Sequence, residues 1–335
     1  MEKIKGIKSI DLLIEADGYG VVNANGTATL IGDNGKEVDN HTMPKLRGYT
    51  NLTGRVKEET GYKYKKQVND IDFTKTPMYV SQNCIRHHLY KDCVAVDQYI
   101  NTKKIKQMLL SEVGLVRGYM VPNAGFKRSS SLFMSDFVDQ LGNGNYEQFV
   151  SSMAISSEVD KVTNEVIYNK SSTSLFSKTT FGETLYKAHA SINIESLQFI
   201  SLDQKFGRAA MVIKKGDGES LAQAMQDYIQ SLDHSRSPSV TFHENYVRIG
   251  NELKIGEVGL LLDDVAIDIV VQTTIKRIQN LMFYQNDGWL KVSKVTVDYN
   301  DGQPLRCLFN PNMIELEKTG PYAIYYTAVE NEDNN

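Results

Sequence analysis

The sequence contains little cysteine, and its cysteines form no pattern that suits a metal site or a disulfide framework. Cys84, Cys93 and Cys307 are an odd number, and no two of them stand in a CxxC spacing. This usage predicts reduced thiols in a cytoplasmic protein. No apolar run approaches the roughly 20 residues that a membrane-spanning helix needs, so we expect no membrane segment.

Motifs for nucleotide binding and for metal catalysis are also absent. The string nearest to a P-loop, at 32–37, lacks both the glycine spacing and the final hydroxyl residue. The six histidines form neither a His-Glu-x-x-His helix nor a cluster with cysteine. We interpret the acidic pair Asp70 and Asp72 as solvated caps. The sequence therefore predicts no enzyme, no cofactor and no metal.

The formal net charge of −4 hides a local excess of positive charge. Residues 44–91 hold ten Lys or Arg against four acids, and a second basic stretch occupies 103–128. Acidic residues gather at 263–268 and at 330–333. A molecule with one basic and one acidic face suits a polyanionic ligand or head-to-tail stacking of copies.

Hydrophobic periodicity predicts an α+β fold in which long polar excursions interrupt the regular elements. We expect strands at 9–16, 115–121, 188–202, 290–299 and 322–329, and helices at 81–90, 105–113, 132–141, 221–232 and 263–281. Residues 17–77 are expected to form a long basic insertion, and 151–174 a flexible polar stretch.

The start of the helix at Ser81 is the clearest candidate for a phosphate contact. Ser81, Gln82 and Asn83 supply a hydroxyl and two amides, and Arg86 and His87 follow one turn later. Helix N-termini attract phosphate through their free backbone amides. A plain capped helix with a surface arginine would give the same residues.

Basic residues alternate with aromatic residues before this helix. Lys45 and Arg47 stand in one such run, and 62–66 form another. Single-strand binders use this mixture, because rings stack on bases while cations follow the phosphates. A solvated hairpin with lysines at its edges is the alternative. Lys127 and Arg128 form a weaker basic patch.

Several segments together resemble the crRNA-binding backbone subunits of type I CRISPR Cascade, in the RAMP superfamily, and most of all those of the type I-F variant. These segments are 39–54, 81–89, 176–182 and 193–203. The resemblance implies one ferredoxin-like, RRM-type palm over 1–335. It also implies large inserted elements, namely a basic finger at 17–77 and a polar insertion with a thumb hairpin at 142–187.

The resemblance further implies a non-catalytic subunit of an antiviral ribonucleoprotein. Copies would polymerise as a helical filament along the crRNA spacer, beside other Cascade subunits, and present the guide for pairing with target DNA. The helix at Ser81 would hold crRNA phosphates. The segment 176–186 would be the thumb hairpin that reaches a neighbouring subunit, in which Lys178 and Phe181 wedge beside a flipped nucleotide. Polar contacts to the RNA backbone would come from Ser177, Lys178, Thr179 and Thr180.

Two alternatives stay open on the sequence alone. A type III-like backbone subunit would cleave target RNA with a metal held in the loop after the first strand, where Asp33 and Asp39 lie. A structural protein would instead use the basic insertion to bind an acidic surface of another protein.

Overall fold

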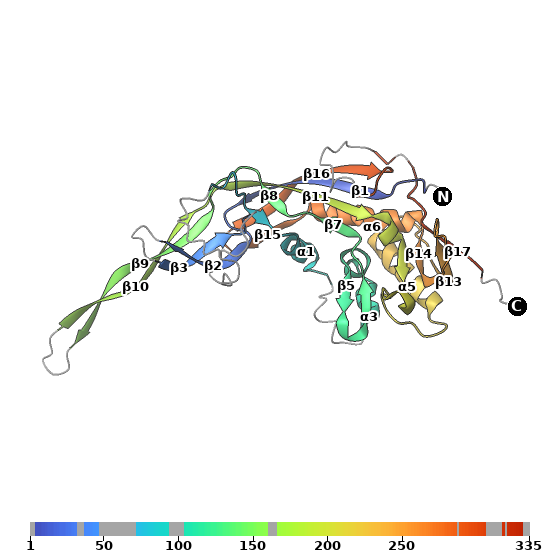
Figure 1. Ribbon diagram of the computed structural model, residues 1–335, viewed down its shortest axis with the longest axis horizontal. Helices are drawn as coiled ribbons and strands as arrows, with labels where there is room; N and C mark the ends of the chain where they lie inside the picture. The colour runs from blue at the N-terminus through green and yellow to red at the C-terminus, as the bar shows by residue number, and fades with distance from the viewer. Residues whose placement is uncertain are drawn as a thin grey trace.

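The computed structural model describes residues 4–31, 37–46, 72–93, 104–159, 166–286, 288–305, 317–318 and 320–330. At 25–31, 37–43, 123, 146–159 and 166–180 it describes only the backbone. Figure 1 shows a curved sheet along the upper side of the molecule, with α1, α5 and α6 beneath it.

The central strand of this sheet is β1 (Ser9–Tyr19), which pairs antiparallel with β11 (Glu183–Asn193) on one side and with β16 (Gly288–Asn300) on the other. The sheet has seven strands in the order β15-β16-β1-β11-β8-β4, and β7 also pairs with β11. The short strands are β15 (Met282–Gln285), β8 (Phe137–Asp139), β4 (Tyr79–Val80) and β7 (Leu132–Met134). Ile10, Leu12 and Ile14 are fully buried at period two, so one face of β1 forms the core.

Three helices lie below this sheet (Figure 1), namely α1 (Gln82–Tyr90), α5 (Gly218–Leu232) and α6 (Asp264–Gln279). Asp263 starts α6, because its Oδ1 accepts the N–H of Ala266 at 2.7 Å. Ile267, Val270 and Val271 are buried at helical spacing on the side that packs against β16 and α5. The helices predicted at 81–90, 221–232 and 263–281 are therefore confirmed.

A second sheet has the order β12-β14-β13-β17. Its strands are β12 (Phe199–Ser201), β14 (Glu257–Leu262), β13 (Val240–Arg248) and β17 (Tyr326–Ala328). The smaller elements nearby are α3 (Ile105–Leu109), η3 (Val113–Arg117), η4 (Pro122–Ala124), α4 (Ile194–Gln198), η5 (Gln204–Phe206), and the hairpin of β5 (Tyr119–Val121) and β6 (Phe126–Arg128).

Another four-stranded sheet has the order β10-β9-β3-β2. Its strands are β10 (Val166–Thr180), β9 (Tyr146–Val159), β3 (Glu37–Pro44) and β2 (Ala24–Ile31). The backbones of β9 and β10 pair from Val166 opposite Val159 to Thr180 opposite Tyr146. Within the stretch 151–174, which the sequence predicts to be flexible, residues 151–159 and 166–174 have extended backbone and belong to β9 and β10.

Three other predictions need correction. The helix predicted at 132–141 is wrong, because Leu132, Met134 and Phe137 are buried residues of β7 and β8. The strand predicted at 188–202 is interrupted by α4, where Asn193 Oδ1 accepts the N–H of Ser196 at 2.8 Å and starts a helical turn. The strand predicted at 115–121 begins as η3 and becomes extended only in β5.

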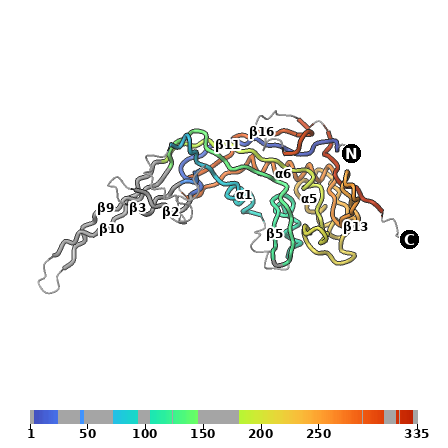
Figure 2. Tube along the Cα trace, viewed as in Figure 1, coloured from blue at the N-terminus to red at the C-terminus, as the bar shows by residue number. Residues whose placement is uncertain are grey.

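Segments near the two ends of the chain lie side by side, as Figure 2 shows. The N–H of Ile7 donates to Pro321 O at 3.0 Å, and Ala323 N–H donates to Ile7 O at 2.8 Å. Asp268 on α6 secures this junction by accepting the hydroxyl of Tyr322 at 2.6 Å. No helix in the described part of the chain is long and apolar enough to span a membrane.

Candidate nucleic-acid interface

Helix α1 begins at the predicted cap. The Oγ of Ser81 accepts the N–H of Cys84 at 3.4 Å, which confirms the capped helix. The N–H groups of Ser81 and Gln82 donate to Asn23 Oδ1 at 3.0 Å and to Asp136 Oδ1 at 2.9 Å. Both amides therefore already donate to protein acceptors, and the acceptor of the Gln82 N–H is a carboxylate. The prediction of free backbone amides is wrong for these two groups.

The side chains of Gln82, Asn83 and His87 are exposed on α1. Asn83 and His87 are four residues apart, so they share one face of the helix. The next ring, His88, faces inward and stacks on Phe283 with centroids 3.8 Å apart. Its Nε2 lies 2.6 Å from Gln285 Oε1, and burial lowers the pKa of His88. The exposed amides and His87 thus form the open side of α1.

Arg86 is half-buried and holds α1 against the segment that leads to β7. Its Nη2 donates to Ser130 Oγ at 2.5 Å, Leu132 O at 3.3 Å and Arg117 O at 3.4 Å. Burial lowers the pKa of Arg86. A phosphate at this nitrogen would have to replace those bonds, so the interpretation of Arg86 as a surface arginine needs correction.

Lys45 lies beside α1, although 36 positions separate it from Ser81 in the sequence. Its N–H donates to Asn23 O, and its carbonyl accepts the N–H of Tyr79, both at 2.9 Å. Burial raises the pKa of Cys84, and the nearby positive charge of Lys45 partly offsets that effect. The structure thus brings Lys45 to the start of α1. Arg47 lies outside the described residues.

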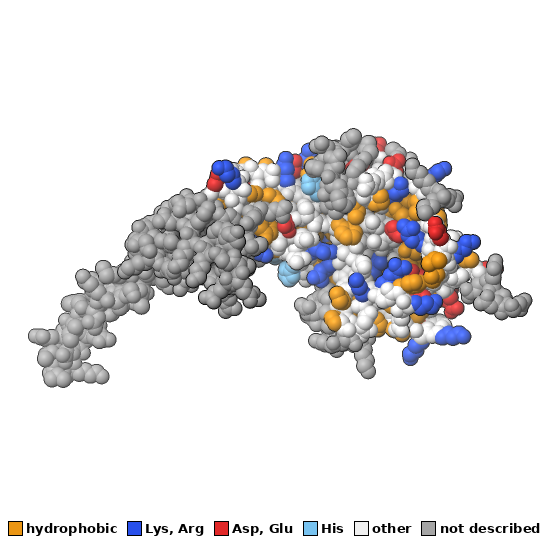
Figure 3. Space-filling view, in the orientation of Figure 1, with side chains coloured by type: hydrophobic (Ala, Val, Ile, Leu, Met, Phe, Trp, Pro, Cys, Tyr) orange, Lys and Arg blue, Asp and Glu red, His pale blue; other side chains and the backbone are white. Residues whose placement is uncertain are grey.

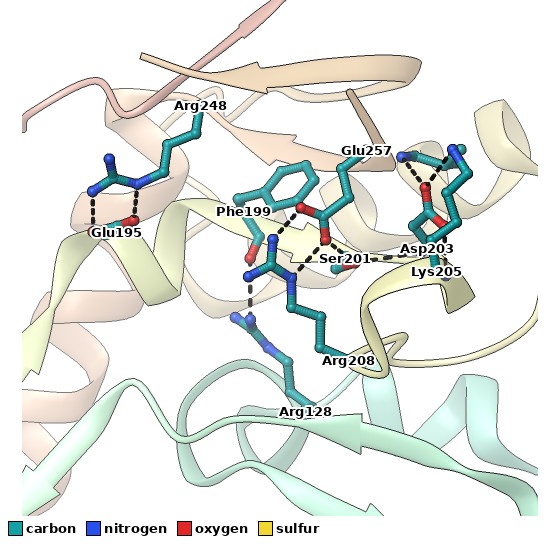
Figure 4. Close-up of polar contacts among 10 residues, drawn as sticks. Arg128, Glu195, Phe199, Ser201, Asp203, Lys205, Arg208, Arg248 and Glu257 are labelled. Atoms are coloured by element: carbon teal, nitrogen blue, oxygen red, sulfur yellow. Dashed lines mark hydrogen bonds and ion pairs between the residues drawn. The ribbon is translucent and has the colours of Figure 1, made fainter. Parts of the chain in front are cut away.

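Lys127 and Arg128 have different surroundings on β6. Lys127 is exposed, whereas Arg128 is 7% exposed and donates from Nε to Gly114 O at 3.3 Å and from Nη1 to Phe199 O at 3.1 Å. Figure 4 shows Arg128 directed toward Phe199. Burial lowers the pKa of Arg128 to about 10. The prediction of a basic surface patch therefore holds only for Lys127.

The predicted thumb hairpin at 176–186 is wrong in its course. Ser177, Lys178 and Thr179 belong to β10, which pairs with β9, whereas β11 pairs with β1. Phe181 and Gly182 therefore connect two sheets. The ring of Phe181 is half-buried and meets Tyr19 edge-on, with centroids 6.4 Å apart. The hairpin is formed by β9 and β10.

Sequence reasoning missed a basic and aromatic segment after β12. Lys205, Phe206 and Arg208 are all exposed on the loop that begins at Asp203. Their order places a ring between cations, which is the signal that singled out 62–66. Figure 3 shows Lys and Arg side chains gathered in the middle of the viewed face, below the sheet.

The acidic candidates give no metal site within the described chain. No group of three His, Cys, Asp or Glu residues there could hold a metal ion. Asp33 and Asp70 lie outside the described residues, and only the backbone of Asp39 is described. Asp72 caps a turn, because its Oδ1 accepts the N–H of Thr74 at 3.1 Å. The hydroxyl of Thr74 also donates to this oxygen at 2.5 Å, and this bond, followed by the contact with the Lys75 side chain, lowers the pKa of Asp72 to about 2.

These features define a mixed α/β protein, built on a curled antiparallel sheet, that carries exposed cations and amides along α1 and β6. The model of a family described as type I-Fv CRISPR-associated protein Cas7fv-like matches residues 6–329, so the chain belongs to this family. The resemblance to the backbone subunit of type I-F variant Cascade is thereby confirmed. No curated protein matches the chain. A chain of a solved "CRISPR RNA-guided surveillance complex" is similar at 10% identity over 71% of this chain and 70% of that one, with a TM-score of 0.20.

Proposed function

We propose that this chain is the non-catalytic crRNA-binding backbone subunit of a type I-F variant Cascade complex. Several copies polymerise along the spacer, beside other Cascade subunits, and present the guide to target DNA. The observation that carries the proposal is the family match over 6–329, nearly the whole chain. Phosphate contacts position a strand without selecting its bases, so sequence specificity belongs to the guide.

The arrangement of the large sheet supports an RRM-type palm spanning 1–335. Four strands of this sheet follow one another along the chain as β1, β8, β11 and β16, and they stand side by side in the order β16-β1-β11-β8. The first and third strands of the chain order, β1 and β11, therefore lie in the middle. Along the chain, α1 follows β1 and α6 follows β11. A ferredoxin-like fold has this arrangement. We assign 17–77 to a finger, and 142–187 to an insertion in which β9 and β10 form the thumb.

Exposure and hydrogen bonding within the protein divide the proposed RNA contacts. Gln82, Asn83, His87 and Lys127 are exposed and Lys45 is half-buried, and these five side chains contact crRNA phosphates. The remaining residues act through them or rest on the family resemblance. Ser81 and Arg86 hold α1 in place. Arg128 anchors β6 through Nε and Nη1 and leaves Nη2 without a partner among the described residues. Ser177, Lys178, Thr179 and Phe181 are assigned to the crRNA backbone and a flipped nucleotide.

The proposal is tested by expressing the chain with and without a CRISPR array and sequencing the RNA that copurifies. Array-derived RNA of uniform length in a large particle supports the backbone role. A nucleic-acid-free monomer from both preparations would refute it. Intact target RNA after incubation with magnesium supports a non-catalytic subunit, whereas cleavage that disappears in Asp33→Ala or Asp39→Ala would establish the type III-like alternative.

A further inference from the structure

The loop after β12 is fixed at both ends, although it is exposed. Asp203 is 6% exposed, and its Oδ1 accepts the N–H of Lys205 at 2.9 Å, which starts the turn η5. Gly207 ends the turn at a φ of 61°, which favours glycine. The N–H of Ala210 then donates to Ser201 O at 2.8 Å. The turn therefore presents its side chains on a rigid support.

This support holds an aromatic ring in solvent next to a guanidinium. The ring of Phe206 is 39% exposed, and Arg208 Cζ lies 5.2 Å from its centroid. Arg208 is fixed by Glu257, which accepts from its Nε at 2.8 Å and from its Nη2 (Figure 4). Glu257 is 3% exposed and also accepts the hydroxyl of Ser201 at 2.5 Å. Both planar groups are therefore positioned before any ligand arrives.

A polar pocket beside this pair carries positive charge that the described residues leave unpaired. Lys127, Arg128, Ser129 and Arg208 line the pocket. Arg128 donates to two neutral carbonyls, and its Nη2 has no hydrogen-bond partner among the described residues. The acid Glu195, which also lines the pocket, already pairs with an arginine of β13. A buried cation with neutral acceptors favours an anion beside it.

The pocket and the ring belong to one surface. The N–H of Lys127 donates to Ala209 O at 2.9 Å, which ties β6 to the loop three residues after Phe206. Rings that stack on bases and cations that hold the next phosphate are the two components of single-strand recognition.

We propose that Phe206 and Arg208 stack against one base of a single-stranded nucleic acid, and that the pocket lined by Lys127 and Arg128 takes an adjacent phosphate. This inference rests on the proposed RNA-binding function and adds a contact to it. An apolar protein partner would leave the basic pocket unused, and an acidic protein partner would leave the exposed ring of Phe206 unused.

The test measures the affinity of the full chain for oligouridine RNA and for inorganic polyphosphate, which has no bases. Phe206→Leu should weaken oligouridine binding by about 5- to 100-fold, the loss expected for one stacked base, and leave polyphosphate binding unchanged. Phe133→Leu is the matched control, because Phe133 is also 39% exposed, and it should leave both affinities unchanged. Lys127→Gln should lower the slope of log affinity against log salt by about 0.7.

The outcomes separate this inference from the function beneath it. A wild-type chain that binds no oligouridine refutes both. Normal binding with no loss in Phe206→Leu refutes the stacking site alone, and reduced self-association in that variant would then assign the surface to protein contacts. As a direct readout, Phe206→Trp should add fluorescence that oligouridine quenches and polyphosphate does not. Equal signals with both ligands would contradict stacking.

Discussion

The contrast between Arg86 and Lys45 yields the sharpest prediction about α1. The sequence predicts that both residues contact phosphate. In the structure Arg86 bonds protein acceptors, whereas the partly open Lys45 lies beside the helix start. We therefore expect Arg86→Met to lower the free energy of unfolding, and Lys45→Gln to lower RNA affinity instead.

The size of the expected loss in unfolding free energy depends on which acceptors lose a hydrogen-bond donor when Arg86 is replaced. Ser130 Oγ can still donate to Leu132 O at 2.7 Å, so the principal loss is the charged bond to Arg117 O. The methionine side chain keeps most of the packing. We expect a cost of about 2 kcal/mol, which is typical of one hydrogen bond to a charged group. Urea unfolding measures this value.

The second arm measures RNA affinity at several salt concentrations. Each phosphate contact contributes about 0.7 to the slope of log affinity against log salt for a single strand. Lys45→Gln should therefore reduce the slope by about 0.7 and leave unfolding unchanged, while Arg86→Met should keep the wild-type slope. A normal unfolding free energy together with a reduced slope in Arg86→Met would refute the structural role of Arg86.

Other predictions concern the core and the chain ends. Because folding lowers the pKa of His88, the unfolded chain binds its proton more readily, and the free energy of unfolding should fall as the pH drops below about 6.5. In urea unfolding, His88→Gln should lose less of this free energy over that range than the wild type. An equal loss in both proteins would contradict this. Gly18→Ala would place a Cβ 2.6 Å from Thr184 Oγ1 and should cost about 2 kcal/mol, so unchanged unfolding would contradict the close approach. Asp268→Ala removes the carboxylate that accepts from Tyr322, so amide exchange in the C-terminal segment should accelerate, and wild-type exchange there would argue against this anchor.

The parts of the fold that could be predicted from the sequence are those with long, regular periodicity. The apolar spacing of α5 and α6 and the alternation of β1 leave one structural solution. The segment 132–141 fails because three short apolar groups fit helical and strand spacing equally well. Only pairing with β11 decides between them.

The candidate site was predictable in its residue types and less so in their exposure. Arg86 and Arg128 have the chemistry of phosphate ligands, but backbone carbonyls distant in the sequence satisfy much of their hydrogen-bonding capacity. No local pattern encodes such partners. Phe206 and Arg208 do carry a local signal, a ring between cations, yet the fixed geometry depends on Glu257, which lies 49 positions beyond Arg208.

The central claim is that copies of this chain polymerise along a guide RNA. Native mass spectrometry of the chain assembled on guides with progressively longer spacers tests it most directly. The account predicts that the number of copies on each RNA rises stepwise with spacer length. A constant number of copies on every guide would contradict it.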